Sequence, residues 1–239
     1  MFTLRRIIIV LCMICILSGN AIGAESESHL QKKLGIGIKP GIHNFVDSDL
    51  TDFWKFNPDS NDFMAELSYE LKIIQPIGLE FSLGRTSMVA SSNSTLENSD
   101  QAVLDINSFY LSPTIKLYHK LTSRLLIFGG VGPDIYRTKG NLNYYLGSNQ
   151  YKLGISKLVY GVHGLFGIEY YFSTNPAASG SYDWPVSVEV QYRYATAVLD
   201  DADKVLINQI NDDRSTSYAS HELDVGGHSI TIGLKWHLF

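Results

Sequence analysis

The segment that decides the fold is the last one in the chain, Ser229–Phe239, which reads S-I-T-I-G-L-K-W-H-L-F. Side chains of a β-strand alternate between two faces with a period of two residues. One face of this segment carries Ile230, Ile232, Leu234, Trp236 and Leu238, and the other carries Ser229, Thr231, Gly233, Lys235 and His237. A chain that ends on such a strand, with an aromatic last residue, is typical of a transmembrane β-barrel that its final strand closes.

The N-terminal residues predict export. Arg5 and Arg6 precede an apolar run over residues 7–17, and small residues follow up to Ala24. A charged start, a short apolar stretch and a small-residue cleavage site are the three parts of a secretory signal peptide. The apolar run is shorter than the ~20 residues that a membrane-spanning helix needs. We therefore expect a signal peptide over residues 1–24 and one mature domain over residues 25–239.

Composition narrows the function of the mature domain. Both cysteines, Cys12 and Cys15, fall in the signal peptide, so we expect no disulfide bond, thiol nucleophile or Cys-based metal site. Loss of Arg5 and Arg6 lowers the 19 basic residues to 17 against 24 acidic ones, a net charge of −7. Proteins that bind nucleic acid carry a basic surface, so this class of partner is excluded. We also expect no cofactor.

Eight segments of the mature domain have strand character. In chain order they span residues 34–45, 63–74, 77–86, 106–118, 124–136, 158–172, 186–194 and 229–239. Each is long enough for the ~9–11 tilted residues with which a strand crosses a bilayer. Long loops are expected at residues 46–62, 87–105, 137–157 and 195–227, and they alternate with tight turns such as Gln75-Pro76. This rhythm is typical of outer-membrane barrels, although residues 173–185 are long for a periplasmic turn.

Alternation alone fits two structures. The apolar faces could form the core of a soluble barrel or sandwich, or they could meet lipid. Glycines gather on the polar faces, among them Gly78, Gly84, Gly161 and Gly167. A narrow barrel interior has little room for side chains, whereas glycine weakens a strand face that water covers. We therefore predict an all-β fold, an eight-stranded antiparallel up-and-down transmembrane β-barrel with its polar faces inward.

The polar faces would bring charged residues together in the lumen. The candidate ion-pair network consists of Glu70, Glu80, Glu169, Glu189, Arg193 and Lys235. Side chains roughly fill an eight-stranded interior, and an isolated buried ion costs several kcal/mol. We predict an ion-paired plug centred on the seventh and eighth strands, with Arg193 and Lys235 among the glutamates. A permeation path is the alternative.

Aromatic residues near the strand ends predict girdles at the two membrane interfaces. The expected members are Tyr118, Tyr170, Tyr171, Phe172, Trp184 and Trp236 towards the periplasm, and Phe45, Tyr136 and Tyr194 at the other end. The alternative is that these residues simply favour strands.

Four stretches give the chain a family resemblance. They are F-G-G-V-G-P-D-I-Y at Phe128–Tyr136, Y-G-V-H-G-L-F-G-I-E-Y-Y-F at Tyr160–Phe172, V-S-V-E-V-Q-Y-R-Y at Val186–Tyr194, and the closing strand. From about Lys33 to Phe239 the chain resembles the small outer-membrane β-barrels of Gram-negative bacteria, the OmpX- and OmpW-like group with the OmpA-type eight-stranded barrel. The resemblance implies insertion by the outer-membrane assembly machinery, which reads the C-terminal strand. One departure is that Leu238, rather than Phe239, is in phase with the outward residues.

Two loops carry further candidates. In D-F-W-K-F at Asp52–Phe56, Trp54 could pack over the barrel mouth, bind an apolar solute or enter the outer leaflet. The last long loop is acidic through Asp200, Asp201 and Asp203, among others. Dense carboxylates can hold Ca²⁺ or bridge lipopolysaccharide, but the spacing matches no calcium loop, and a solvated loop is the simpler interpretation.

An enzyme at the rim is the rival class of function. A Ser-His pair needs both side chains on one side of the strand, whereas the adjacent His228 and Ser229 point to opposite faces. His43 and His221 are expected near acidic residues at the outer rim. We expect no catalytic residue and no metal site, and predict a monomeric, non-enzymatic outer-membrane protein in contact with membrane lipid and lipopolysaccharide. Its role would be structural or surface contact; a narrow channel for small or apolar solutes is the alternative, and a rim enzyme the third.

Overall fold

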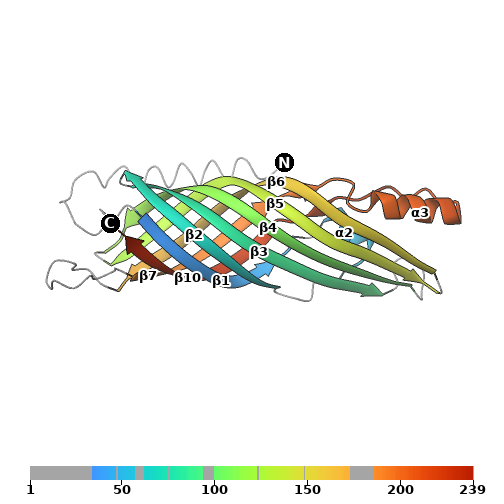
Figure 1. Ribbon diagram of the computed structural model, residues 1–239, viewed down its shortest axis with the longest axis horizontal. Helices are drawn as coiled ribbons and strands as arrows, with labels where there is room; N and C mark the ends of the chain where they lie inside the picture. The colour runs from blue at the N-terminus through green and yellow to red at the C-terminus, as the bar shows by residue number, and fades with distance from the viewer. Residues whose placement is uncertain are drawn as a thin grey trace.

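The chain forms a closed antiparallel barrel of eight long strands (Figure 1). The computed structural model describes residues 34–46, 48–56, 62–74, 76–93, 100–122, 124–147, 149–172 and 186–238. The barrel strands are β1 (Leu34–Asn44), β2 (Asp62–Ile74), β3 (Ile77–Asn93), β4 (Asp100–Lys120), β5 (Leu125–Leu146), β6 (Asn149–Tyr171), β7 (Val186–Thr196) and β10 (Gly227–Leu238). Neighbours in sequence are neighbours in the ring, and β10 pairs with β1 to close it. The up-and-down barrel is confirmed. The predicted signal peptide, the connection at residues 173–185 with Trp184, and Phe239 lie outside the described residues.

The closing strand β10 has the two faces that its sequence predicts. Lys235 and His237 are buried in the lumen, at 1% and 2% exposure, whereas Ile232 is 58% exposed on the outside. Ile36 and Leu234, on the neighbouring strands β1 and β10, also point outward. The exterior of the barrel is therefore apolar where its interior is charged, which is the arrangement of a barrel that lipid surrounds.

Strands β3 to β6 are much longer than predicted, and most of the residues expected in two long loops belong to them. The reason is visible on β4, where the polarity of the two faces reverses along the strand. Near the tight turns Ile115 points outward and Lys116 inward, but further out Asn107 points outward and Leu104 inward. The alternation continues without a break, so the strand continues too. The Ser- and Asn-rich composition of these segments reflects a solvated outer face and not a loop.

The long strands form a wall that stands beyond the rest of the barrel and carries a second core (Figure 1). Two helices, α2 (Asp49–Phe53) and α3 (Lys204–Arg214), and the short pair β8 (Val198–Leu199) and β9 (Leu223–Asp224), pack with the inner faces of these strands. We call their shared cluster the outer core. Its buried members include Leu50, Trp54, Met88, Leu104, Leu142, Tyr144, Leu206, Ile207, Ile210 and Val225. No helix of the described residues is long and apolar enough to cross a membrane.

Candidate functional site

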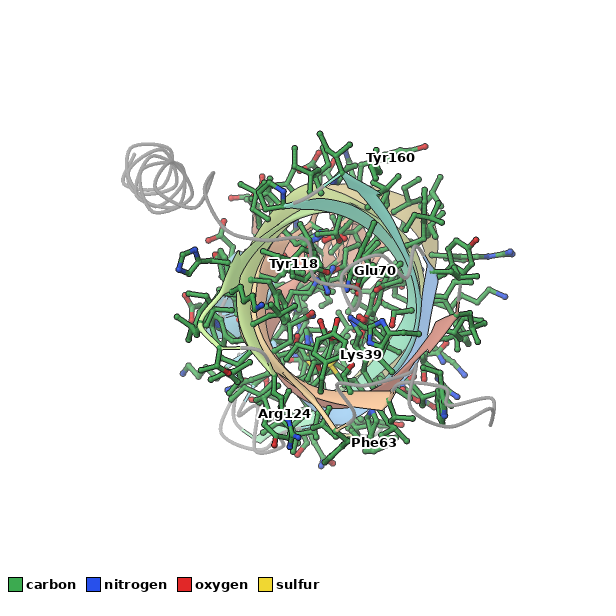
Figure 2. The ribbon with its side chains drawn as sticks, turned by 90° about the vertical axis from the view of Figure 1, so that its left-hand side faces the viewer. Lys39, Phe63, Glu70, Tyr118, Arg124 and Tyr160 are labelled. Atoms are coloured by element: carbon green, nitrogen blue, oxygen red, sulfur yellow. The ribbon has the colours of Figure 1, made fainter. Side chains whose placement is uncertain are left out.

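Three lysines and five glutamates fill the middle of the lumen. We call this set, Lys39, Lys116, Lys235, Glu66, Glu70, Glu80, Glu169 and Glu189, the ionic plug. All eight side chains are at most 3% exposed. Figure 2, which looks into the barrel from the end with the tight turns, shows Lys39 and Glu70 pointing inward and Phe63 and Tyr160 pointing away.

Each lysine of the plug contacts several carboxylates. Lys39 Nζ lies 2.8 Å from Glu80 Oε1, 2.8 Å from Glu189 Oε1 and 3.1 Å from Glu66 Oε1. Lys235 Nζ lies 2.6 Å from Glu70 Oε2, 2.7 Å from Glu189 Oε2 and 3.6 Å from Glu169 Oε1. The contacts of 2.6–2.8 Å have the length of strong charge-assisted hydrogen bonds, and Lys39 bridges Glu80 on β3 and Glu189 on β7, which lie on opposite sides of the ring.

Glu189 is the hub of the plug. Besides its contacts with Lys39 and Lys235, its Oε2 lies 3.8 Å from Lys116 Nζ, which also contacts Glu80 Oε2 at 2.6 Å. Among the candidate residues, the structure therefore brings together Glu70, Glu80, Glu169, Glu189 and Lys235. Lys39 is absent from the predicted network, although it shares the alternation of Gly37 and Gly41 on the inner face of β1.

Arg193 belongs to a second cluster nearer the outer end. Its Nη2 lies 2.7 Å from Asp134 Oδ2 and donates to Ser112 Oγ at 3.0 Å and to the Tyr136 hydroxyl at 3.3 Å. Its guanidinium carbon also lies 4.7 Å from the centre of the Tyr110 ring. The partner of Arg193 is thus an aspartate that the predicted network did not contain, and not one of its glutamates. The sequence alone could not predict that Arg193 pairs with Asp134, because this pairing depends on the stagger of the strands in the closed ring.

Asp134 also forms a chain with His163 and Thr114. His163 Nδ1 lies 2.8 Å from Asp134 Oδ1, and its Nε2 lies 2.9 Å from Thr114 Oγ1. A hydroxyl, an imidazole and a carboxylate in this order also occur in nucleophilic enzymes. The three side chains are at most 5% exposed inside the lumen, so a substrate cannot approach the hydroxyl. Their contacts instead satisfy buried polar atoms.

An aromatic layer fills the end of the lumen next to the tight turns. Tyr118, Leu126, Phe128, Leu165 and Tyr171 form a buried cluster there. Lys72 Nζ donates to the Tyr171 hydroxyl at 2.7 Å and lies 5.5 Å from the centre of the Tyr118 ring. The prediction that Tyr118 and Tyr171 belong to a membrane girdle was therefore wrong, because both point inward.

The same correction applies at the other end of the strands. Phe45 and Tyr136, also predicted in a girdle, are buried inside at 8% and 0% exposure. Tyr170 and Phe172 are exposed on the outside at 41% and 56%, as expected of girdle residues.

The loop candidates Trp54 and Asp203 meet in the outer core. Trp54 Nε1 donates to Asp203 Oδ2 at 2.9 Å, and both side chains are buried. Asp203 also accepts hydrogen bonds from the His221 backbone N–H at 2.7 Å, and its Oδ2 lies 2.8 Å from His221 Nδ1. Trp54 stands at the end of α2 and Asp203 at the start of α3, so this buried carboxylate ties together the two loops that cover the barrel mouth.

The other two loop candidates lie at the surface. The backbone oxygen of Asp200 accepts a hydrogen bond from Lys157 Nζ at 3.3 Å. Hydrogen bonds from Lys204 Nζ and Ser220 Oγ lower the pKa of Asp201 below its usual value. The described residues hold no group of three or more metal-ligating side chains.

The two histidines that could have served a rim enzyme have different surroundings. His43 is buried in the lumen with its ring edge-on to Phe45 at 4.6 Å. His221 stacks on Phe53 at 4.0 Å between ring centres while Asp203 holds its Nδ1.

Comparisons with known proteins found solved structures of limited similarity. No protein-family model matches the chain, and no curated protein matches it. Neisserial surface protein A, a solved structure, has 13% identity and a TM-score of 0.48, covering 86% of this chain and 97% of that one. The outer membrane protein OprG from Pseudomonas aeruginosa has 12% identity and a TM-score of 0.49, covering 85% and 95%. Ail, the attachment invasion locus protein of Yersinia pestis, has 11% identity and a TM-score of 0.41, covering 86% and 99%.

The assignment to a membrane rests on the barrel itself. Its strands form a closed ring with a charged interior and an apolar exterior, which is the arrangement that a lipid bilayer requires. The chain forms a transmembrane β-barrel with the architecture of the outer-membrane type. Outer-membrane barrels have short turns in the periplasm and long loops outside the cell, which would place the turns between β2 and β3 and between β4 and β5 on the periplasmic side and the outer core on the outside.

Proposed function

We propose that this outer-membrane barrel is a non-enzymatic structural and surface-contact protein whose lumen does not conduct. The ionic plug carries the proposal, because its eight charged side chains are buried and interlinked across the ring. The aromatic layer with Tyr118 and Tyr171 closes the periplasmic side of the plug, and the outer core closes the other side. The aromatic layer, the ionic plug and the outer core would therefore block the lumen at three successive depths.

The outer core supports the surface-contact part of the proposal. Strands β3 to β6 hold α2 and α3 beyond the apolar belt, and the buried bond between Trp54 and Asp203 fixes the two loops to each other. The outer core, with α2 and α3 held in fixed positions, would present a defined surface outside the cell. A porin, in contrast, has a polar, water-filled lumen that its loops leave open.

Conductance across a planar lipid bilayer tests the closed lumen. The wild-type barrel should give no discrete openings. Glu189→Ala should introduce openings with a preference for anions, because three lysines would lose their shared carboxylate and would attract water into the plug. Glu222→Ala is the matched control, since the Glu222 side chain is exposed in the last loop and its loss should leave the bilayer silent.

Discrete openings of the wild type that Glu189→Ala or Arg193→Ala abolishes would show a permeation path that uses these charges. Heat-modifiable gel migration of each refolded variant must first show a folded barrel. Loss of a lipid- or peptide-hydrolysing activity on His43→Ala would instead favour the rim enzyme.

A further inference from the structure

The outward faces of β3, β4, β5 and β6 change from apolar to basic within three rows of residues. The register places Leu83, Leu111, Ile135 and Tyr160 side by side in one row. The next row outward contains Arg85, Phe109, Arg137 and Leu158. The third row contains Ser87, Asn107, Lys139 and Ser156. The apolar belt therefore ends at the second row, and three positive side chains mark its outer boundary.

These three basic residues lie close together on one surface. Arg85 and Arg137 occupy the same row with Phe109 between them, so their strands are separated by ~10 Å. Lys139 follows Arg137 by two residues on β5, on the same face. All three are exposed. A ligand with several negative groups could therefore contact all three at once.

The arrangement of Arg85 is partly fixed before any ligand binds. Its Nη2 donates to Asn107 Oδ1 at 2.7 Å, and its guanidinium carbon lies 5.5 Å from the centre of the Phe109 ring. A guanidinium held by one bond and one ring keeps its other donors free for an anion, and the planar fork matches phosphate oxygens.

No carboxylate neutralises this cluster among the described residues. Neither Arg137 nor Lys139 makes an ion pair there. The acidic residue on the same face is Asp105, one row further out, and its Oδ1 accepts a hydrogen bond from Asn107 Nδ2 at 3.3 Å. Unpaired cations just above a lipid-facing belt are expected where the membrane surface carries anionic groups.

We propose that Arg85, Arg137 and Lys139 form a binding site for the phosphate groups of an outer-leaflet glycolipid of the lipid A type. The acyl chains would cover Leu83, Leu111 and the other residues of the apolar row, while the phosphates would lie against the three cations. The site rests on the outer-membrane location but not on whether the lumen conducts.

The test measures the affinity of the full-length refolded barrel for fluorescent bis-phosphorylated lipid A in detergent micelles. The triple variant Arg85→Ala, Arg137→Ala, Lys139→Ala should bind at least about tenfold more weakly, because hydrogen bonds to charged groups each contribute more than the ~1.4 kcal/mol of a tenfold change. Lipid A that lacks one phosphate should bind wild type more weakly, and added salt should reduce the wild-type affinity.

The matched control removes two positive charges elsewhere on the surface, Arg124→Ala at the periplasmic end and Lys152→Ala further out on β6. This double variant should keep the wild-type affinity. Equal binding by the triple variant and wild type would overturn the site, and so would equal competition by phosphatidylglycerol or by inorganic phosphate. Bilayer conductance of the triple variant separates the two proposals, since it should match that of wild type whether or not lipid A binds.

Discussion

Removal of Lys39 is the sharpest test of how the lumen is held together. Its ammonium lies within 3.1 Å of carboxylate oxygens from Glu66, Glu80 and Glu189, on three other strands, and is fully buried. Lys39→Met keeps most of the side-chain volume and removes only the charge. The three carboxylates would then face one another with less compensation in a site of low dielectric.

The expected loss of stability follows from the geometry. At an effective dielectric of ~20, one attraction between unit charges about 2.8 Å apart is worth roughly 6 kcal/mol. Most of the sum is offset by the cost of removing the ammonium from water and by the repulsion among the glutamates. Breaking a buried ion pair by removing one partner typically costs about 3–5 kcal/mol, and we expect Lys39→Met to lower the free energy of unfolding by this amount.

Urea unfolding from phospholipid vesicles, followed by tryptophan fluorescence and by heat-modifiable gel migration, measures this loss. Lys152→Met is the matched control, because Lys152 is exposed on β6 and its replacement should change the free energy of unfolding by less than about 0.5 kcal/mol. In the double variant Lys39→Met, Glu80→Gln, the two losses should not add, with a coupling of about 0.5–3 kcal/mol. If Lys39→Met were as stable as Lys152→Met, the plug would contribute nothing to stability and the reasoning would be wrong.

Two other predictions use the unfolding and gel assays, the second together with limited proteolysis. A methyl group at Gly84 would lie 2.1 Å from the Tyr110 ring, so Gly84→Ala should displace the tyrosine from Glu66 and lower the free energy of unfolding by about 1–3 kcal/mol, whereas Gly154→Ala, with open space around it, should not. Asp203→Ala should leave the gel shift of the barrel intact but expose α2 and α3 to proteases, since Trp54 and His221 would lose their shared acceptor. Asp200→Ala should leave protease resistance unchanged, and equal cleavage of both variants would contradict a lock at Asp203.

The barrel strands could be predicted from the sequence because alternation is a local property. The faces of β10 follow directly from its residues, and the outward position of Ile232 and the inward position of Lys235 agree with that expectation. The lengths of β3 to β6 could not be predicted in the same way. Beyond the membrane the outer face becomes polar and the inner face apolar, so the segments near Met88 and Leu142 lose the pattern of a lipid-facing strand while remaining strands.

The contents of the lumen could be predicted, but its pairings could not. Any inward-facing charge must find a partner, and alternation shows which charges face inward. Which of them meet depends on the tilt and stagger of the closed ring, a property of all eight strands together. This is why the partner of Arg193 is Asp134 on β5, and why Lys39, next to a proline on β1, joins the glutamates of β2, β3 and β7.

The positions of the plug lysines have a consequence for the order of folding. Lys39 stands on β1 and Lys235 on β10, the two strands that meet only when the ring closes. The contacts that cross this seam, Lys39 with Glu189 and Lys235 with Glu70, therefore form only at that last pairing event, and the open sheet has no low-dielectric interior. The electrostatic stabilisation would arise after the rate-limiting step, so Lys235→Met should speed unfolding far more than it slows folding. An equal effect on both rates would show instead that the lysine finds its partners before the seam forms.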